Sequence, residues 1–156
     1  MKNDLLPTPE LFACNEVELH FKRPLFDSMY HIAHADDVVN LIKKFPSYMK
    51  LDVKEYFWLI SLTNANKVLS ASEINIGTLD TTVINIREIF QTALLTHAKA
   101  IILVHNHPSG NVNPSMADKD ITKKMKQAAE YLELTILDHI IITKDAYFSF
   151  ADEGVL

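Results

Sequence analysis

Two histidines and one aspartate stand at a spacing that suits a metal site. His105 and His107 are separated by one residue at the end of an apolar run, and Asp118 follows eleven residues after His107. Residues i and i+2 of extended backbone point to the same face, so both imidazoles can aim at one point. The proline- and glycine-containing stretch 107–114 can turn the chain back, so that Asp118 reaches the same point. Two imidazoles and a carboxylate, with a fourth position left for water, are typical of a catalytic zinc site.

Parts of this pattern also have a simpler interpretation. Ser115-x-x-Asp118 before an apolar stripe is a capping box, with Ser115 as the N-cap and Asp118 as the third helical residue. The complete order of strand, H-x-H, Pro-Gly loop, S-x-x-D and helix is more specific than any of its parts and favours a metal site. The two interpretations are compatible, because one carboxylate oxygen can cap the helix while the other binds a metal.

Apolar patterning predicts the elements that carry these residues. Residues 56–63 and 100–104 are short apolar runs rich in branched or aromatic side chains, which favours buried strands. Further strands are expected at 15–22, 68–76, 135–143 and 146–151, and helices at 34–45, 85–98 and 116–134. The helix at 116–134 is expected to bury a stripe made of Ile121, Met125, Ala128 and Leu132. Strands that alternate with helices indicate an α/β layer structure.

Composition limits the class of protein. With 156 residues, 48% hydrophobic and 22% charged, the chain fits one globular domain, expected at 15–156 after a flexible arm at 1–14. Cys14 is the single cysteine, which suits a reducing compartment. We find no secretory signal and no membrane span, so a cytoplasmic location is expected. The net charge of −5 argues against a nucleic-acid-binding domain, and we expect duplex DNA to bind weakly and without sequence preference.

The motifs resemble those of a known superfamily. H-x-H-x7-S-x-x-D is similar to the metal signature of the JAMM (MPN-plus, JAB-type) metalloproteases, and HNHPSG with DHIII downstream resembles their RadC branch. The likeness runs from about His34 to the C-terminus. It implies a JAB/MPN-like (cytidine-deaminase-like) α/β fold, a three-layer arrangement of a curved mixed sheet with flanking helices. It also implies one zinc ion held by His105, His107 and Asp118, and a Ser115 that steadies a developing oxyanion.

The resemblance further implies an upstream glutamate as general base, and two residues are candidates. Glu55 immediately precedes the apolar run that begins at Tyr56, where a strand beside 100–104 could set its first residues near the metal. Glu73 lies inside the expected strand 68–76, where alternation can leave it exposed. In JAMM proteins the glutamate precedes the first apolar core strand. We therefore predict that Glu55 is the general base. Glu73 is the alternative base, and Glu55 would then be an ordinary surface residue.

Asp138 and His139 form a second polar pair, in the expected strand 135–143. Neighbouring residues of a strand face opposite ways, so one of the two can point toward the site. There it could hydrogen-bond a ligand imidazole, as supporting carboxylates often do. A structural role for both residues is the alternative.

The predicted function is a zinc-dependent, RadC-like hydrolase that cleaves amide or isopeptide bonds of a peptide or protein with a metal-activated water. The alternative is an accessory module associated with DNA repair or nucleic acid, with a structural or vestigial metal site. The intact ligand set favours the hydrolase, and the acidic charge weighs against the module. Nothing in the sequence matches the N-terminal helix-hairpin-helix segment that full-length RadC proteins carry. A nuclease or deaminase is less favoured, because no second metal cluster and no P-C-x-x-C pattern is present.

Overall fold

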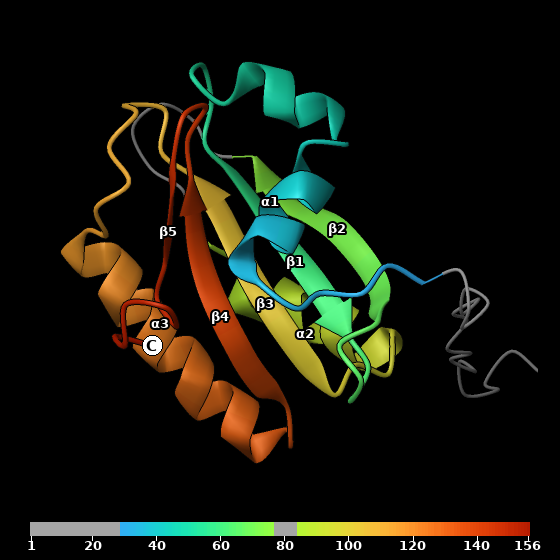
Figure 1. Ribbon diagram of the computed structural model, residues 1–156. Helices are drawn as coiled ribbons and strands as arrows, with labels where there is room; N and C mark the ends of the chain where they lie inside the picture. The colour runs from blue at the N-terminus through green and yellow to red at the C-terminus, as the bar shows by residue number, and fades with distance from the viewer. Residues whose placement is uncertain (1–28, 77–83) are drawn as a thin grey trace, which may run out of the picture.

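The computed structural model describes residues 29–76 and 84–156 (Figure 1). The elements in these ranges are α1 (Ala35–Ile42), the 3-10 helix η2 (Pro46–Lys50), β1 (Tyr56–Leu62), β2 (Val68–Ile76), α2 (Ile86–Leu95), β3 (Ala100–Asn106), α3 (Met116–Tyr131), β4 (Thr135–Ile142) and β5 (Tyr147–Ser149). The expected strand at 15–22 and the arm at 1–14 lie outside the described residues. Within the described ranges, no helix has the length and apolar character needed to cross a membrane.

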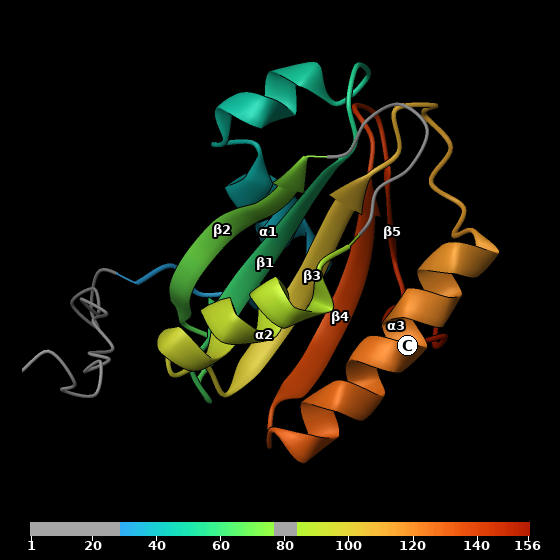
Figure 2. The ribbon, with the colours of Figure 1, turned by 180° about the vertical axis from the view of Figure 1, so that it is seen from behind.

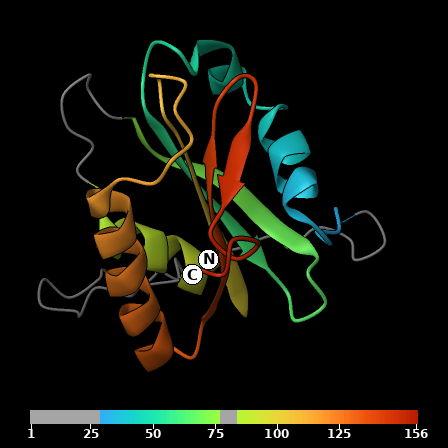
Figure 3. The same ribbon diagram turned by 60° about the vertical axis from the view of Figure 1, so that its left-hand side comes forward.

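The strands form one mixed sheet with helices on both faces. The strand order is β2-β1-β3-β4-β5; β3 and β4 run parallel, and the other neighbouring pairs run antiparallel. Figure 3 shows α1 on one side of the sheet and α2 with α3 on the other, and Figure 2 shows the face that α2 and α3 cover. This arrangement confirms the expected α/β class with a mixed sheet between helical layers.

Two hydrophobic clusters hold the layers together. Toward α2 and α3 the sheet presents Phe57 and Leu103, and toward α1 it presents Trp58 and Val104. Successive side chains of a strand alternate between faces, so β1 and β3 contribute to both clusters and are buried along their whole length. His105 follows Leu103 by two residues and therefore belongs to the face that α2 and α3 cover.

The first helix is shorter than the expected 34–45 because of the proline that follows it. Pro46 disfavours helical backbone at the residue before it. Phe45 is accordingly extended, with ψ 139°, and α1 ends at Ile42. The two acidic residues at its start, Asp36 and Asp37, lie in the first turn, where they favour the positive end of the helix dipole.

The buried stripe of α3 differs from the expected one. Asp118, Thr122, Met125 and Ala129 are its buried residues. Of the residues expected in that stripe only Met125 is fully buried, and Leu132 is 38% exposed. The prediction was wrong because it counted apolar side chains alone. The N-terminal half of α3 turns two polar side chains inward, toward the end of β3.

Candidate metal centre

The candidate metal ligands lie together where β3 ends. His105 is the penultimate residue of β3, His107 is the first residue after it, and Asp118 lies in the first turn of α3. Their ligand atoms are within 4.8 Å of one another. His105 Nε2 lies 3.1 Å from His107 Nε2 and 3.1 Å from Asp118 Oδ1, and His107 Nε2 lies 3.4 Å from Asp118 Oδ2. The three side chains can therefore hold one metal ion.

These separations suit a tetrahedral metal. Zinc bonds to nitrogen and oxygen are about 2.0–2.2 Å long, so two ligands of a tetrahedral site stand about 3.3–3.5 Å apart. The two separations from His105 Nε2, 3.1 Å to His107 Nε2 and 3.1 Å to Asp118 Oδ1, lie within a few tenths of that value. Zinc accepts this mixture of imidazole and carboxylate ligands, and three protein ligands leave a fourth position open.

Hydrogen bonding fixes which nitrogen of His107 faces the centre. His107 Nδ1 lies 2.7 Å from the backbone carbonyl oxygen of Asn111. A carbonyl oxygen only accepts, so Nδ1 carries the proton and donates it. Nε2 of the neutral imidazole then has a free lone pair, directed at His105 and Asp118. A second partner that orients a ligand imidazole is a regular feature of metal sites.

Asp118 carries a negative charge that suits a cation site. Burial opposes ionisation of the carboxyl group, but the neighbouring His105 and His107 imidazoles, which can donate to it when a proton lies in place of a metal ion, outweigh burial and hold the pKa of Asp118 well below its ordinary value. The same carboxylate raises the pKa of His107, against the opposing effect of burial. Asp118 is therefore ionised at neutral pH.

Ser115 and Asp118 also form the capping box expected from the sequence. Asp118 Oδ2 accepts hydrogen bonds from the backbone N–H and the hydroxyl of Ser115, at 2.7 and 2.6 Å. The Ser115 hydroxyl in turn accepts from the Asp118 backbone N–H at 3.1 Å. Asp118 Oδ1 stays directed at His105. The carboxylate therefore caps α3 through Oδ2, which also lies 3.4 Å from His107 Nε2, and faces His105 with Oδ1.

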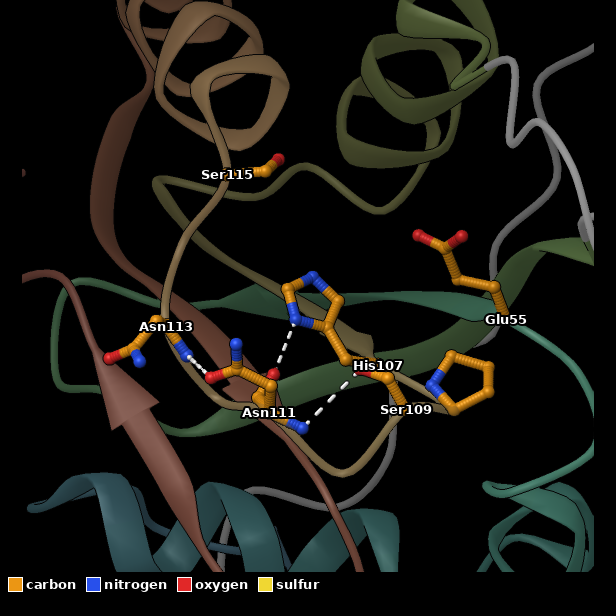
Figure 4. Close-up of a pocket in the computed structure, with 7 residues that line it drawn as sticks. Glu55, His107, Ser109, Asn111, Asn113 and Ser115 are labelled. Carbon is orange, nitrogen blue, oxygen red and sulfur yellow. Dashed lines mark hydrogen bonds between the residues drawn. The ribbon is translucent and has the colours of Figure 1, made fainter.

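Glu55 lines a cavity beside this centre. The cavity has a volume of about 410 Å³ and is lined by Glu55, His107, Pro108, Ser109, Asn111, Asn113 and Ser115. Figure 4 shows Glu55 and Ser115 approaching it from different elements. The cause is the antiparallel pairing of β1 with β3, in which Phe57 is the partner of His105. The residue just before β1 thus lies beside the residues that follow β3.

Glu73, the alternative base, is not brought to the centre. It is exposed in β2 and pairs with Trp58 of β1. Directly paired residues of neighbouring strands point to the same face. Trp58 packs in the cluster beneath α1, so Glu73 lies on the face of the sheet opposite to His105.

Comparison with known proteins assigns the chain to a family. Residues 32–155 match the family described as RadC-like JAB domain. The chain belongs to this family. It is 50% identical over 101 residues to a UPF0758 protein of Flavobacterium johnsoniae, covering 65% of this chain and 44% of that relative. It is 41% identical over 139 residues to a UPF0758 protein of Chlorobium chlorochromatii, covering 88% of this chain and 60% of the relative. This RadC-like chain therefore spans about half of the length of the curated relatives it matches.

Asn106 ties the Glu55 segment of the RadC-like domain to β3. Its side-chain nitrogen donates to the carbonyl oxygens of Leu51 and Lys54 at 2.7 and 2.8 Å. Its side-chain oxygen accepts from the Tyr56 backbone N–H at 2.7 Å. These three bonds fix the chain on both sides of Glu55. This role of Asn106 is not among those predicted from the sequence, although a polar residue at the end of a buried strand indicates a need for buried partners.

We expect Asn106→Leu to destabilise the fold. The substitution keeps the side-chain size but leaves three backbone groups near Leu51, Lys54 and Tyr56 without their partner. An unpaired buried polar group costs about 1–3 kcal/mol, so the free energy of unfolding should fall by at least about 2 kcal/mol in denaturant titration. Asn113→Ala is the control and should change stability by less than about 0.5 kcal/mol, because the side chain is exposed. An Asn106→Leu variant as stable as the parent would contradict the assigned role.

His139 supports the candidate ligand His105. His139 Nε2 lies 2.9 Å from His105 Nδ1, and His139 Nδ1 lies 2.6 Å from the Thr122 hydroxyl. The imidazole is fully buried, stacks on Phe150 and lies against Phe57, and burial lowers its pKa well below the ordinary value. Of the pair Asp138 and His139, it is thus the histidine that contacts a candidate ligand.

A register shift in β4 directs His139 toward the centre. Ile101 of β3 pairs with Ile136, but the next residue, Ile102, pairs with Asp138. Leu137 is thus an extra residue, and the side chains that follow it change faces. Asp138 is buried elsewhere, where its carboxylate accepts from the Ser149 hydroxyl at 2.6 Å and from backbone N–H groups. Asp138 therefore holds the end of β5 and the residues after it against β4, and these hydrogen bonds do not reach the candidate ligands.

Proposed function

We propose that this chain is a zinc-dependent hydrolase of amide or isopeptide bonds. The observation that carries the proposal is the convergence of three acceptors, two imidazole nitrogens and a carboxylate oxygen, on one point beside an open cavity. Such acceptors repel one another unless a proton or a cation lies between them. The cavity gives a substrate access from the side on which Glu55 lies.

The proposed roles follow from where the side chains lie. His105, His107 and Asp118 would hold the metal ion. When bound, zinc lowers the pKa of water and polarises a carbonyl group as a Lewis acid. Glu55 is proposed as the general base, which takes the proton of the attacking water and delivers it to the leaving nitrogen. Ser115 is proposed to turn its hydroxyl proton, which Asp118 Oδ2 accepts in this structure, to the oxyanion that develops on the substrate carbonyl.

The proposed substrate is a peptide or protein. Attack of water on the carbonyl carbon breaks the bond to nitrogen and yields a carboxylate and an amine, so the reaction needs no further reactant. The cavity beside His107 is lined by uncharged side chains apart from Glu55 and His107 itself, which suits a neutral peptide group. A cytoplasmic location is proposed for the same chain, since a single cysteine suits a reducing compartment.

Metal analysis combined with activity screening tests the proposal. We expect about one zinc per chain, and hydrolysis of a peptide or isopeptide substrate that a chelator abolishes and added zinc restores. Single- and double-stranded nucleic acids serve as the comparison substrates. A zinc-loaded protein that leaves peptide and isopeptide panels intact would overturn the hydrolase assignment and favour an accessory module.

A further inference from the structure

We propose that Thr122 and His139 are positioning residues that fix the tautomer of His105 and so keep its Nε2 free for a metal ion. The inference rests on the metal-binding part of the proposed function. It concerns a chain of three hydrogen bonds that leads from His105 through His139 and Thr122 to the backbone carbonyl of Asp118. The distances along it are 2.9, 2.6 and 2.6 Å.

The donor and acceptor of each hydrogen bond in this series are fixed by its last bond, from Thr122 to the Asp118 carbonyl. Thr122 Oγ1 lies 2.6 Å from the carbonyl oxygen of Asp118 and 2.6 Å from Nδ1 of His139. A carbonyl oxygen has no proton to give, and a hydroxyl has one proton to donate. The Thr122 proton therefore goes to Asp118, and the Thr122 oxygen accepts at its other contact. It follows that Nδ1 of His139 carries a proton.

The position of the proton on His139 in turn determines which nitrogen of His105 is the donor. The neutral imidazole is the favoured form of His139, because the ring is enclosed between Phe57 and Phe150 and no carboxylate of residues 29–76 or 84–156 hydrogen-bonds to it. Its Nε2 is then an acceptor, so Nδ1 of His105 must be the donor across 2.9 Å. The lone pair of His105 is thereby left on Nε2, the atom that faces His107 and Asp118.

Both candidate histidine ligands are thus oriented in the same way. His107 donates from Nδ1 directly to a loop carbonyl, that of Asn111. His105 lies deeper, in β3, and reaches a carbonyl only through His139 and Thr122. The series of hydrogen bonds also ends on the Asp118 backbone carbonyl, and the side chain of the same residue lies 3.1 Å from His105 Nε2. Movement of α3 would therefore disturb the carboxylate ligand and the tautomer of His105 together.

This role explains two buried polar residues in an otherwise apolar layer. Thr122 is 3% exposed and His139 is fully buried, both on the side of the sheet that α2 and α3 cover. If Thr122 and His139 only hydrogen-bonded to each other, either of them could be the donor, and no third group would be needed. The Asp118 carbonyl oxygen can only accept a hydrogen bond, so it fixes Thr122 as its donor and as the acceptor from His139.

The test compares Thr122→Val with Thr122→Ser in the whole chain. Valine has nearly the shape of threonine but no hydroxyl, whereas serine keeps the hydroxyl. In metal-free protein at about pH 8, where an ordinary imidazole is neutral, long-range nitrogen–proton NMR reports which nitrogen of His105 carries the proton. We expect a proton on Nδ1 in the parent and in Thr122→Ser, whether or not Nε2 shares a further proton with Asp118, and loss of the Nδ1 proton in Thr122→Val.

Zinc affinity, measured by competition with a chelator, is the second readout. Loss of a supporting partner typically lowers metal affinity about 10–100-fold, and we expect that loss for Thr122→Val but not for Thr122→Ser. Met125→Ala controls for stability, since Met125 is buried on the same stripe of α3. It should lower the unfolding temperature and leave the His105 tautomer unchanged.

Two results would overturn the inference. One is a His105 whose Nδ1 carries no proton in the metal-free parent, and the other is a folded Thr122→Val variant with the His105 protonation and zinc affinity of the parent. A parent that binds zinc without hydrolysing peptides would defeat the proposed hydrolase activity alone. The NMR experiment uses neither metal nor substrate, so it decides about the hydrogen-bond chain in either case.

Discussion

Glu55→Gln is expected to abolish most turnover while the fold and the bound zinc remain. Loss of a general base typically lowers the rate about 10²–10⁴-fold, because the attacking water then keeps its proton. Glutamine has the same shape as glutamate and can still hydrogen-bond, so the segment held by Asn106 should not move. The measurement is kcat on an established peptide or isopeptide substrate, with zinc content determined on the same sample.

Glu73→Gln is the matched control for this prediction. It removes the same charge from an exposed position in β2, on the opposite face of the sheet from His105. We expect its kcat to stay near that of the parent. Near-full activity of Glu55→Gln together with an inactive Glu73→Gln would show that the base has been assigned to the wrong glutamate.

Asp118→Asn is expected to lower the zinc affinity further than loss of any supporting residue, for which about 10–100-fold is typical. The substitution removes the negative charge that faces His105 and His107 at 3.1 and 3.4 Å. Asparagine keeps an oxygen that can accept from Ser115, so the cap of α3 should be largely retained. Calorimetric or chelator-competition titration with zinc measures the change in affinity.

Ser115→Ala separates the two jobs of Asp118. It removes the capping hydroxyl that Asp118 accepts from at 2.6 Å, and leaves the carboxylate in place. Loss of a serine N-cap costs about 1 kcal/mol of stability, so Ser115→Ala should be less stable but should bind zinc as the parent does. If Asp118→Asn bound zinc as tightly as the parent, the carboxylate would be a cap only.

The strands and the cap follow from patterns that span a few residues. The apolar runs 56–63 and 100–104 correspond to β1 and β3, and the S-x-x-D motif to the capping box of Ser115 and Asp118. The convergence of His105 and His107 is equally local, because two residues of an extended strand are enough to align their side chains. The JAB-like family also follows from short motifs, which the match over residues 32–155 bears out.

The surroundings of the centre depend on strand register instead. The pairing of Phe57 with His105 brings Glu55 to the cavity, and the pairing of Trp58 with Glu73 places Glu73 on the far face. These partners are tens of residues apart, so no local pattern specifies which of them meet. Register is set by how the whole sheet buries its two faces.

Asp138 and His139 illustrate this division between sequence and tertiary structure. Alternation predicts that they face opposite ways, but not which one faces the ligands. Ile136 faces α2 and α3, so strict alternation would place Asp138 on that face as well. The extra residue in β4 shifts the alternation and places His139 there instead. A bulge changes every later position of a strand and leaves no mark in the hydrophobic pattern that precedes it. The sequence by itself thus determined the candidate ligand triad and its cap, while the folded sheet decided which candidate base and which supporting imidazole lie beside them.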